Sequence, residues 1–143
     1  MMPRAALFAL LLSVAAPAIA ADPALCPAPA DLGATPYAGW TATDGDATAV
    51  AVGTPVTLPL ADGAASRSLT IATAGRYGVA AGGKVWIDLI ANGATQTSIE
   101  HGHGPQCSGI RKIVWFDLKP GTYELALSKG EAASVRVLVV RAP

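Results

Sequence analysis

Short apolar runs separated by turn residues are the feature that most constrains what this chain can fold into. The runs recur about every 8–12 residues, a spacing typical of sandwiches and barrels. Within them the apolar residues often alternate with polar or small ones, as at Tyr123, Leu125 and Leu127. Asn92-Gly93 is typical of a tight hairpin turn. The pattern predicts an all-β fold, an antiparallel, jelly-roll-like β-sandwich of about eight or nine strands.

The predicted strands share period-two alternation or a compact apolar run bounded by glycine, proline or aspartate. They are Ala47–Val52, Pro55–Leu60, Ser66–Ala72, Arg76–Ala81, Lys84–Ala91, Gln96–His101, Ile110–Leu118, Thr122–Ser128 and Ser134–Arg141. Alternation places Trp86 on the face opposite Val85 and Ile87. No stretch after residue 20 has the pattern of an amphipathic helix.

The first twenty residues have the pattern of a secretory signal peptide. Arg4 is followed by an apolar run, a proline and the small-residue site Ala18-Ile19-Ala20. Asp22 and Pro23 follow at once, and the run is shorter than the ~20 apolar residues of a spanning helix. We therefore expect cleavage after Ala20, a periplasmic or secreted protein, and no integral membrane segment in the mature chain. An extended Pro/Ala-rich segment (21–39) should precede the β-sandwich domain (40–143).

The charge balance argues against a nucleic-acid partner. The whole chain holds ten basic and ten acidic side chains. Loss of Arg4 with the signal peptide leaves a net charge of about minus one. Affinity for nucleic acid comes mainly from cations that neutralise phosphates, and this chain has no excess of them.

The two cysteines, Cys26 and Cys107, predict one disulfide bond, because an exported chain folds in an oxidising compartment. The bond would tie the N-terminal segment to the loop that carries both histidines. The competing interpretation is that Cys107 is a free thiolate ligand beside those histidines.

The segment from Glu100 to Lys112 is the strongest candidate for a functional site. It contains both histidines of the chain, His101 and His103, and their spacing places both imidazoles on one face of a strand. Two such imidazoles can share a metal ion, with iron, copper and zinc as candidates. Asp88 or Asp117 could add an oxygen ligand. The alternative is a structural loop whose imidazoles bond to the backbone or pack on tryptophans.

Arg111, Trp86 and Trp115 are candidate ligand-binding residues. Arg111 and its neighbour Lys112 should point to opposite faces of a strand, so one of them could reach an anion held near the histidines. Trp86 and Trp115, together with Trp40, could form a platform for sugar rings, although core packing is the competing role for an aromatic residue.

The chain resembles a known group of proteins through three motifs. They are Gly39-Trp40, the run His101-Gly-His-Gly-Pro-x-Cys107-x-Gly-Ile-Arg-Lys112, and Leu118-x-Pro-Gly-x-Tyr123. This combination is similar to small exported bacterial proteins that carry the name homogentisate dioxygenase. The resemblance implies non-haem iron held by two histidines and a carboxylate, with His101 and His103 as the imidazoles and Glu100 as the third ligand. In the cupin pattern, His-x-His is followed a few residues later by a glutamate. This chain departs from that pattern, because Cys107 and Ser108 stand where the glutamate would be.

A second resemblance concerns a strand entry in the last third of the chain, which has a similar counterpart earlier in the sequence. Gly75-Arg-Tyr77 and Gly121-Thr-Tyr123 are two similar strand entries, each with a tyrosine expected to be buried. The second resembles the strand entry of pre-peptidase and jelly-roll sandwich domains. That resemblance implies a module that binds carbohydrate or accompanies a secreted enzyme.

Three functions remain open from the sequence. The leading one is an exported binding or accessory module with a metal or small-ligand site at the His-Gly-His loop. Its ligand would be a small molecule or a carbohydrate. The second is a small iron or copper dioxygenase that uses the same histidines. The third is a structural subunit of the cell envelope.

Overall fold

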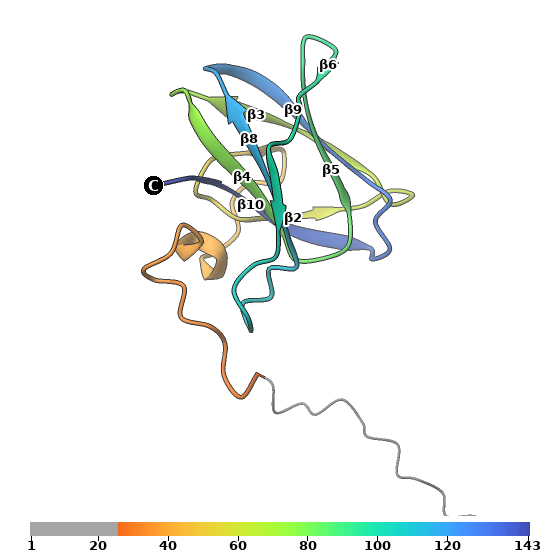
Figure 1. The fold of residues 1–143 in the computed structure, drawn as a ribbon. Helices are drawn as coiled ribbons and strands as arrows, with labels where there is room; N and C mark the ends of the chain where they lie inside the picture. Colours follow the sequence, from red (N-terminus) through yellow and green to blue (C-terminus); the bar gives the residue numbers. More distant parts are fainter. Residues whose placement is uncertain (1–25) are drawn as a thin grey trace, which may run out of the picture.

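Residues 26–143 form two β-sheets that pack face to face, as the computed structural model in Figure 1 shows. The predicted signal peptide (1–20) and the start of the N-terminal segment (21–25) lie outside the described residues. The strands are β1 (Ala49–Val50), β2 (Val56–Pro59), β3 (Ala65–Ile71), β4 (Gly75–Ala81), β5 (Trp86–Ala91), β6 (Ala94–Thr95), β7 (Glu100–Gly102), β8 (Lys112–Leu118), β9 (Gly121–Ser128) and β10 (Ser134–Arg141). The prediction of an all-β sandwich is confirmed.

The first sheet has the strand order β1-β3-β9-β5-β6, and the second has the order β2-β10-β4-β8-β7. All strand pairs are antiparallel except β1 with β3. The main core lies between the sheets and includes Leu58, Leu89, Phe116, Leu125 and Val137, each at most 1 % exposed. In each alternating strand, every second side chain faces inward, and these inward-facing apolar side chains form the core between the two sheets.

The predicted strand Gln96–His101 is only partly correct. The structure forms the short β6 before it and β7 at its end, and residues 96–99 belong to no strand. The physical reason is topological: β6 lies at the edge of the first sheet and β7 at the edge of the second. The chain must therefore leave one ladder and cross to the other within this segment.

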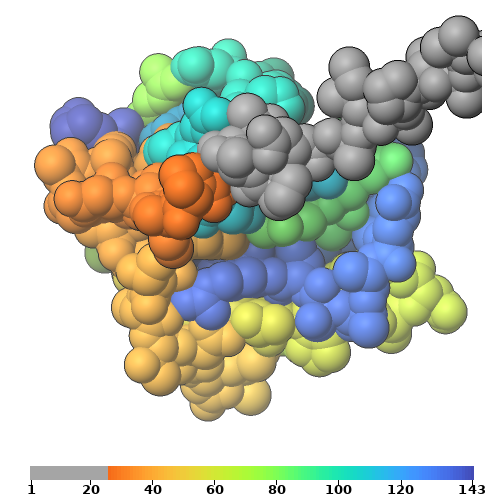
Figure 2. Space-filling model, turned by 90° about the horizontal axis from the view of Figure 1, so that it is seen from below, coloured from red at the N-terminus to blue at the C-terminus, as the bar shows by residue number. Residues whose placement is uncertain are grey.

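The N-terminal segment covers the outer face of the second sheet. In Figure 2 the orange stretch lies against the body of the protein. Among the described residues, the 3₁₀ turn Ala38–Thr41 follows this stretch. Leu32 and Trp40 are buried there against Ile113 and Leu138, in a second apolar cluster. A sheet covered on both faces needs apolar residues on both, which explains the nearly continuous apolar run of β10.

Both predicted tyrosine entries are buried as expected. Tyr77 is 3 % exposed and Tyr123 is 7 % exposed. The Tyr77 hydroxyl donates to the Thr73 carbonyl oxygen at 2.6 Å, and the Tyr123 hydroxyl donates to the Lys119 carbonyl oxygen at 2.8 Å. Each hydroxyl thus bonds four residues upstream and holds the turn that leads into its strand.

Arg136 of β10 fastens residues 40–44, which follow the N-terminal segment, to the second sheet. Its guanidinium donates to the Trp40 carbonyl oxygen at 3.0 and 2.8 Å and to the Ala42 carbonyl oxygen at 2.6 Å, and it pairs with Asp44. A hydrogen bond with the Thr57 side chain, followed by the charge and hydrogen bond of Arg136, holds the pKa of Asp44 below its usual value. Asp44 is therefore ionised at neutral pH, as the ion pair requires.

We expect Arg136→Met to lower the free energy of unfolding by about 2 kcal/mol, because hydrogen bonds to charged groups contribute roughly 1.5–3 kcal/mol. Methionine keeps the apolar stem but removes every donor. Arg141→Met is the matched control, since Arg141 makes one exposed bond, to the Ala74 carbonyl oxygen. Urea unfolding measures both variants. Equal losses in the two would show that the Arg136 contacts do not fasten the segment.

Candidate functional site

The connection between β7 and β8 carries the predicted site. β7 pairs with β8 through Glu100 opposite Trp115, His101 opposite Val114 and Gly102 opposite Ile113. The chain then leaves the ladder and turns back, and the Gly104 amide donates to the Ile110 carbonyl oxygen at 3.2 Å. The loop is therefore closed by its own backbone before β8 begins.

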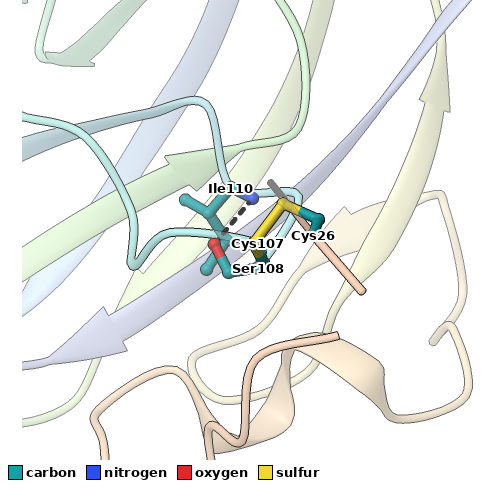
Figure 3. The surroundings of a disulfide bond; sticks show 4 residues. All are labelled: Cys26, Cys107, Ser108 and Ile110. Carbon is teal, nitrogen blue, oxygen red and sulfur yellow. Dashed lines mark hydrogen bonds between the residues drawn. A yellow bond between two sulfur atoms is a disulfide. The ribbon is translucent and has the colours of Figure 1, made fainter. Parts of the chain in front are cut away.

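The Cys26–Cys107 disulfide is present and holds this loop to the N-terminal segment (Figure 3). The two Cα atoms are 5.4 Å apart, and the cysteines are 81 positions apart in the sequence. Beside the bond, the Ala30 amide donates to the Cys107 carbonyl oxygen at 3.0 Å. The Ile110 amide donates to the Ser108 hydroxyl at 3.1 Å, the dashed line in Figure 3. Cys107 is thus bonded to sulfur, and the interpretation of a free thiolate ligand was wrong.

Both histidine rings are exposed and each has a defined partner. The His101 Nε2 atom lies 2.8 Å from the Ser98 hydroxyl, and the His103 Nδ1 atom lies 2.9 Å from the Arg111 carbonyl oxygen. A carbonyl oxygen only accepts hydrogen bonds, so Nδ1 of His103 carries a proton. In the neutral ring, Nε2 of His103 is then left to accept a hydrogen bond from a ligand.

The two histidines line one pocket of about 330 Å³. It lies where the edge strand β7, the connection from β4 to β5 and the start of β8 meet. The lining residues are Gly83, Lys84, Val85, His101, Gly102, His103, Arg111 and Lys112. Of the predicted site residues, the structure therefore brings together His101, His103 and Arg111.

Arg111 and Lys112 both line this pocket, although adjacent strand positions would point to opposite faces. The reason is that β8 begins at Lys112, so Arg111 lies before the strand and outside its alternation. Lys112 Nζ also donates to the Val85 carbonyl oxygen at 3.2 Å. That bond joins two residues that both line the pocket.

The three tryptophans do not form a common platform. Trp86 is 48 % exposed and lines a smaller hollow of about 170 Å³ with Lys84, Val85, Lys112 and Lys129. Trp115 lies instead on the outer face of the second sheet, where its ring covers Gly78 and the Arg76 guanidinium lies 5.1 Å from the ring centre. Trp40 is buried beneath the N-terminal segment.

The residues around the histidines do not fit an iron site with two imidazoles and a carboxylate. Glu100 shares a cross-strand position with Trp115, on the face away from His101, and forms an ion pair with Arg76. Asp88 and Asp117 line neither hollow. Within residues 26–143, no three His, Cys, Asp or Glu side chains are grouped so that they could hold a metal ion.

No sequence pattern marked two lysines and one acidic residue near the pocket, Lys84, Lys129 and Glu131, as candidate site residues. Lys84 and Lys129 come from different connections, and Lys84 Nζ forms an ion pair with Glu131 at 2.8 Å. The hydrogen bond and the charge of Lys84 lower the pKa of Glu131, with a smaller contribution from Arg111. Glu131 is therefore an anion at neutral pH. Only the pairing of β5 with β9 brings these turns together, so local spacing could not reveal them.

None of the helices within residues 26–143 is long and apolar enough to cross a membrane. No model of a known protein family matches the chain, and no curated protein matches it.

Proposed function

We propose that this chain is an exported ligand-binding module, periplasmic or secreted, whose site is the pocket beside His101 and His103. The observation that carries the proposal is the convergence of two histidines, one arginine and two lysines on a single hollow of about 330 Å³. Pockets of roughly 300–1,000 Å³ with a few convergent polar groups are typical of small-molecule sites.

The wall of the pocket combines apolar and polar surface. The loop Gly83-Lys84-Val85 forms one side, and Gly102 leaves the backbone of β7 open to a ligand, since no atom lies within 4 Å of where its Cβ would be. The imidazole nitrogens can exchange hydrogen bonds with hydroxyl groups. This mixture suits a carbohydrate or another hydroxylated small molecule.

Rigidity supports binding at this position. The disulfide, the backbone bond from Gly104 to Ile110 and the bond from His103 to Arg111 all hold the loop before any ligand arrives. A site that is ordered in advance loses less conformational entropy on binding. The disulfide also fits an oxidising compartment outside the cytoplasm.

Titration of ¹⁵N-labelled protein with a panel of mono- and oligosaccharides tests the proposal. We expect shift changes to concentrate at His101, Gly102, His103 and Val85. The double variant His101→Ala/His103→Ala should weaken the best ligand about tenfold or more, since two lost hydrogen bonds contribute roughly 1–3 kcal/mol.

Thr70→Ala/Thr122→Ala is the matched control, because it removes two exposed polar side chains that face each other across β3 and β9. That control should bind as the unmodified protein does. If shift changes map elsewhere, or if the histidine variant binds with full affinity, the pocket is not the binding site.

A further inference from the structure

The pocket and the hollow beside Trp86 gather an unusual share of the positive charge of this chain. Nine Lys and Arg residues follow Arg4 in the sequence. Four of them, Lys84, Arg111, Lys112 and Lys129, line these two hollows. The mature chain as a whole has almost no net charge, so this end of the sandwich is locally basic.

Little of that charge is neutralised by acidic residues. Glu131 pairs with Lys84. Among the ion pairs of residues 26–143, none involves Arg111, Lys112 or Lys129. Asp88 lies two residues beyond Trp86 but lines neither hollow. Arg111 contributes only the smaller charge effect at Glu131, and Lys112 and Lys129 form no ion pair within the described residues.

Trp86 holds two of these cations in place. The Lys112 and Lys129 ammonium groups lie 5.2 and 5.1 Å from the centre of its ring, within the range of a cation–π contact. Lysine side chains are normally mobile, and ordering them opposes binding. An exposed ring that positions two ammonium groups reduces that entropy loss, a role that packing in a core would not require.

The shape of the surface selects an extended ligand. The two hollows share Lys84, Val85 and Lys112, so they adjoin along the end of the sandwich, with volumes of about 330 and 170 Å³. His101, His103 and Arg111 line only the larger hollow, whereas Trp86 and Lys129 line only the smaller one. A chain of sugar rings offers hydroxyl groups to the imidazoles, and a carboxylate on each ring offers a partner to the cations.

We propose that the site selects an acidic polysaccharide, with uronate carboxylates held by Arg111, Lys112 and Lys129 and ring hydroxyls held by His101 and His103. This inference rests on the proposed function and names the ligand class of the same pocket. A nucleic acid fits less well, because it depends on a field that extends along many phosphates, and the basic surface here is short.

The test compares trigalacturonate with its methyl ester, which has the same rings without the charges. We expect the acid to bind about tenfold more tightly at 20 mM salt, and we expect the difference to shrink at 300 mM salt because screening weakens charge pairs. Lys112→Ala/Lys129→Ala should remove the preference for the acid. Lys119→Ala/Arg141→Ala is the control. It removes two exposed cations, one directly after β8 and one at the C-terminal end of β10, and it should keep the preference for the acid.

Lys129→Asn is a second variant, because asparagine tolerates the positive φ of 55° at this position. This variant leaves Lys112 in place, together with its hydrogen bond to the Val85 carbonyl oxygen. It should reduce the preference for the acid on its own. Equal binding of acid and ester in the pocket would overturn the inference and leave the proposed function standing. Absence of binding of the acid would also overturn the inference about the ligand class. The titration with neutral saccharides would then show separately whether the pocket binds ligands at all. Tighter binding of a single-stranded oligonucleotide, sensitive to the same variants, would overturn it in favour of nucleic acid.

Discussion

Replacing either cysteine with serine should lower the melting temperature by about 18 °C. The disulfide joins residues 81 positions apart. On the chain-entropy model, opening a loop of that length costs about 4.5 kcal/mol. For a domain of this size, each kcal/mol corresponds to roughly 4 °C. Thermal unfolding followed by circular dichroism measures the change.

The position of the bond adds a local reason for this loss. Cys26 begins the described part of the segment that buries Leu32 and Trp40 on the second sheet. Cys107 has a φ of 64°, a backbone conformation that residues other than glycine rarely adopt. Without the sulfur bond, both the segment and the loop lose their common anchor, and the free energy of unfolding falls.

A double-mutant comparison separates the bond from the individual side chains. Cys26→Ser, Cys107→Ser and the double variant should all melt at about the same temperature, because each removes the same single bond. Reduction of the unmodified protein with dithiothreitol should give that temperature too. If the double variant lost twice as much as each single variant, the two cysteines would be acting independently.

The alternation of side chains made the strands predictable, but not their order in the sheets. β9 alternates exposed and buried residues in the way that the sequence indicates. Trp86 lies opposite Val85 and Ile87, as alternation predicts. The covering of the second sheet was not predictable, because it depends on how the irregular N-terminal segment folds back. The apolar run Val137–Val140 signals a strand that is buried on both faces, and β4 is likewise buried continuously from Tyr77 to Ala81.

The candidate site was predictable where its residues are neighbours along the chain. His101 and His103 share a pocket because they are two residues apart at the end of an edge strand. Lys84 and Lys129 were missed, because they are 45 positions apart in the sequence and only the register of β5 with β9 brings them together. Trp115 was proposed as a ligand contact, but its register opposite Gly78 places it on the outer face.

Gly104→Ala should lower the free energy of unfolding by about 3 kcal/mol, at the upper end of what overpacking usually costs. A Cβ at this position would lie 2.4 Å from the Ile110 Cβ and 2.6 Å from the Ile110 carbonyl oxygen. The latter is a backbone atom, and it also accepts the hydrogen bond from the Gly104 amide. Neither contact can be relieved by rotating a side chain, so the loop itself must move.

Gly102→Ala is the matched control, two residues away in the same segment. No atom lies within 4 Å of its Cβ position, and its backbone has no positive φ, so alanine should leave stability within about 0.5 kcal/mol of the original. Urea unfolding compares the two variants, and amide shifts of His103 and Arg111 report whether the loop has moved. Equal stability of the two variants would mean that the close approach of Gly104 to Ile110 does not hold the loop, and that the disulfide alone positions the histidines.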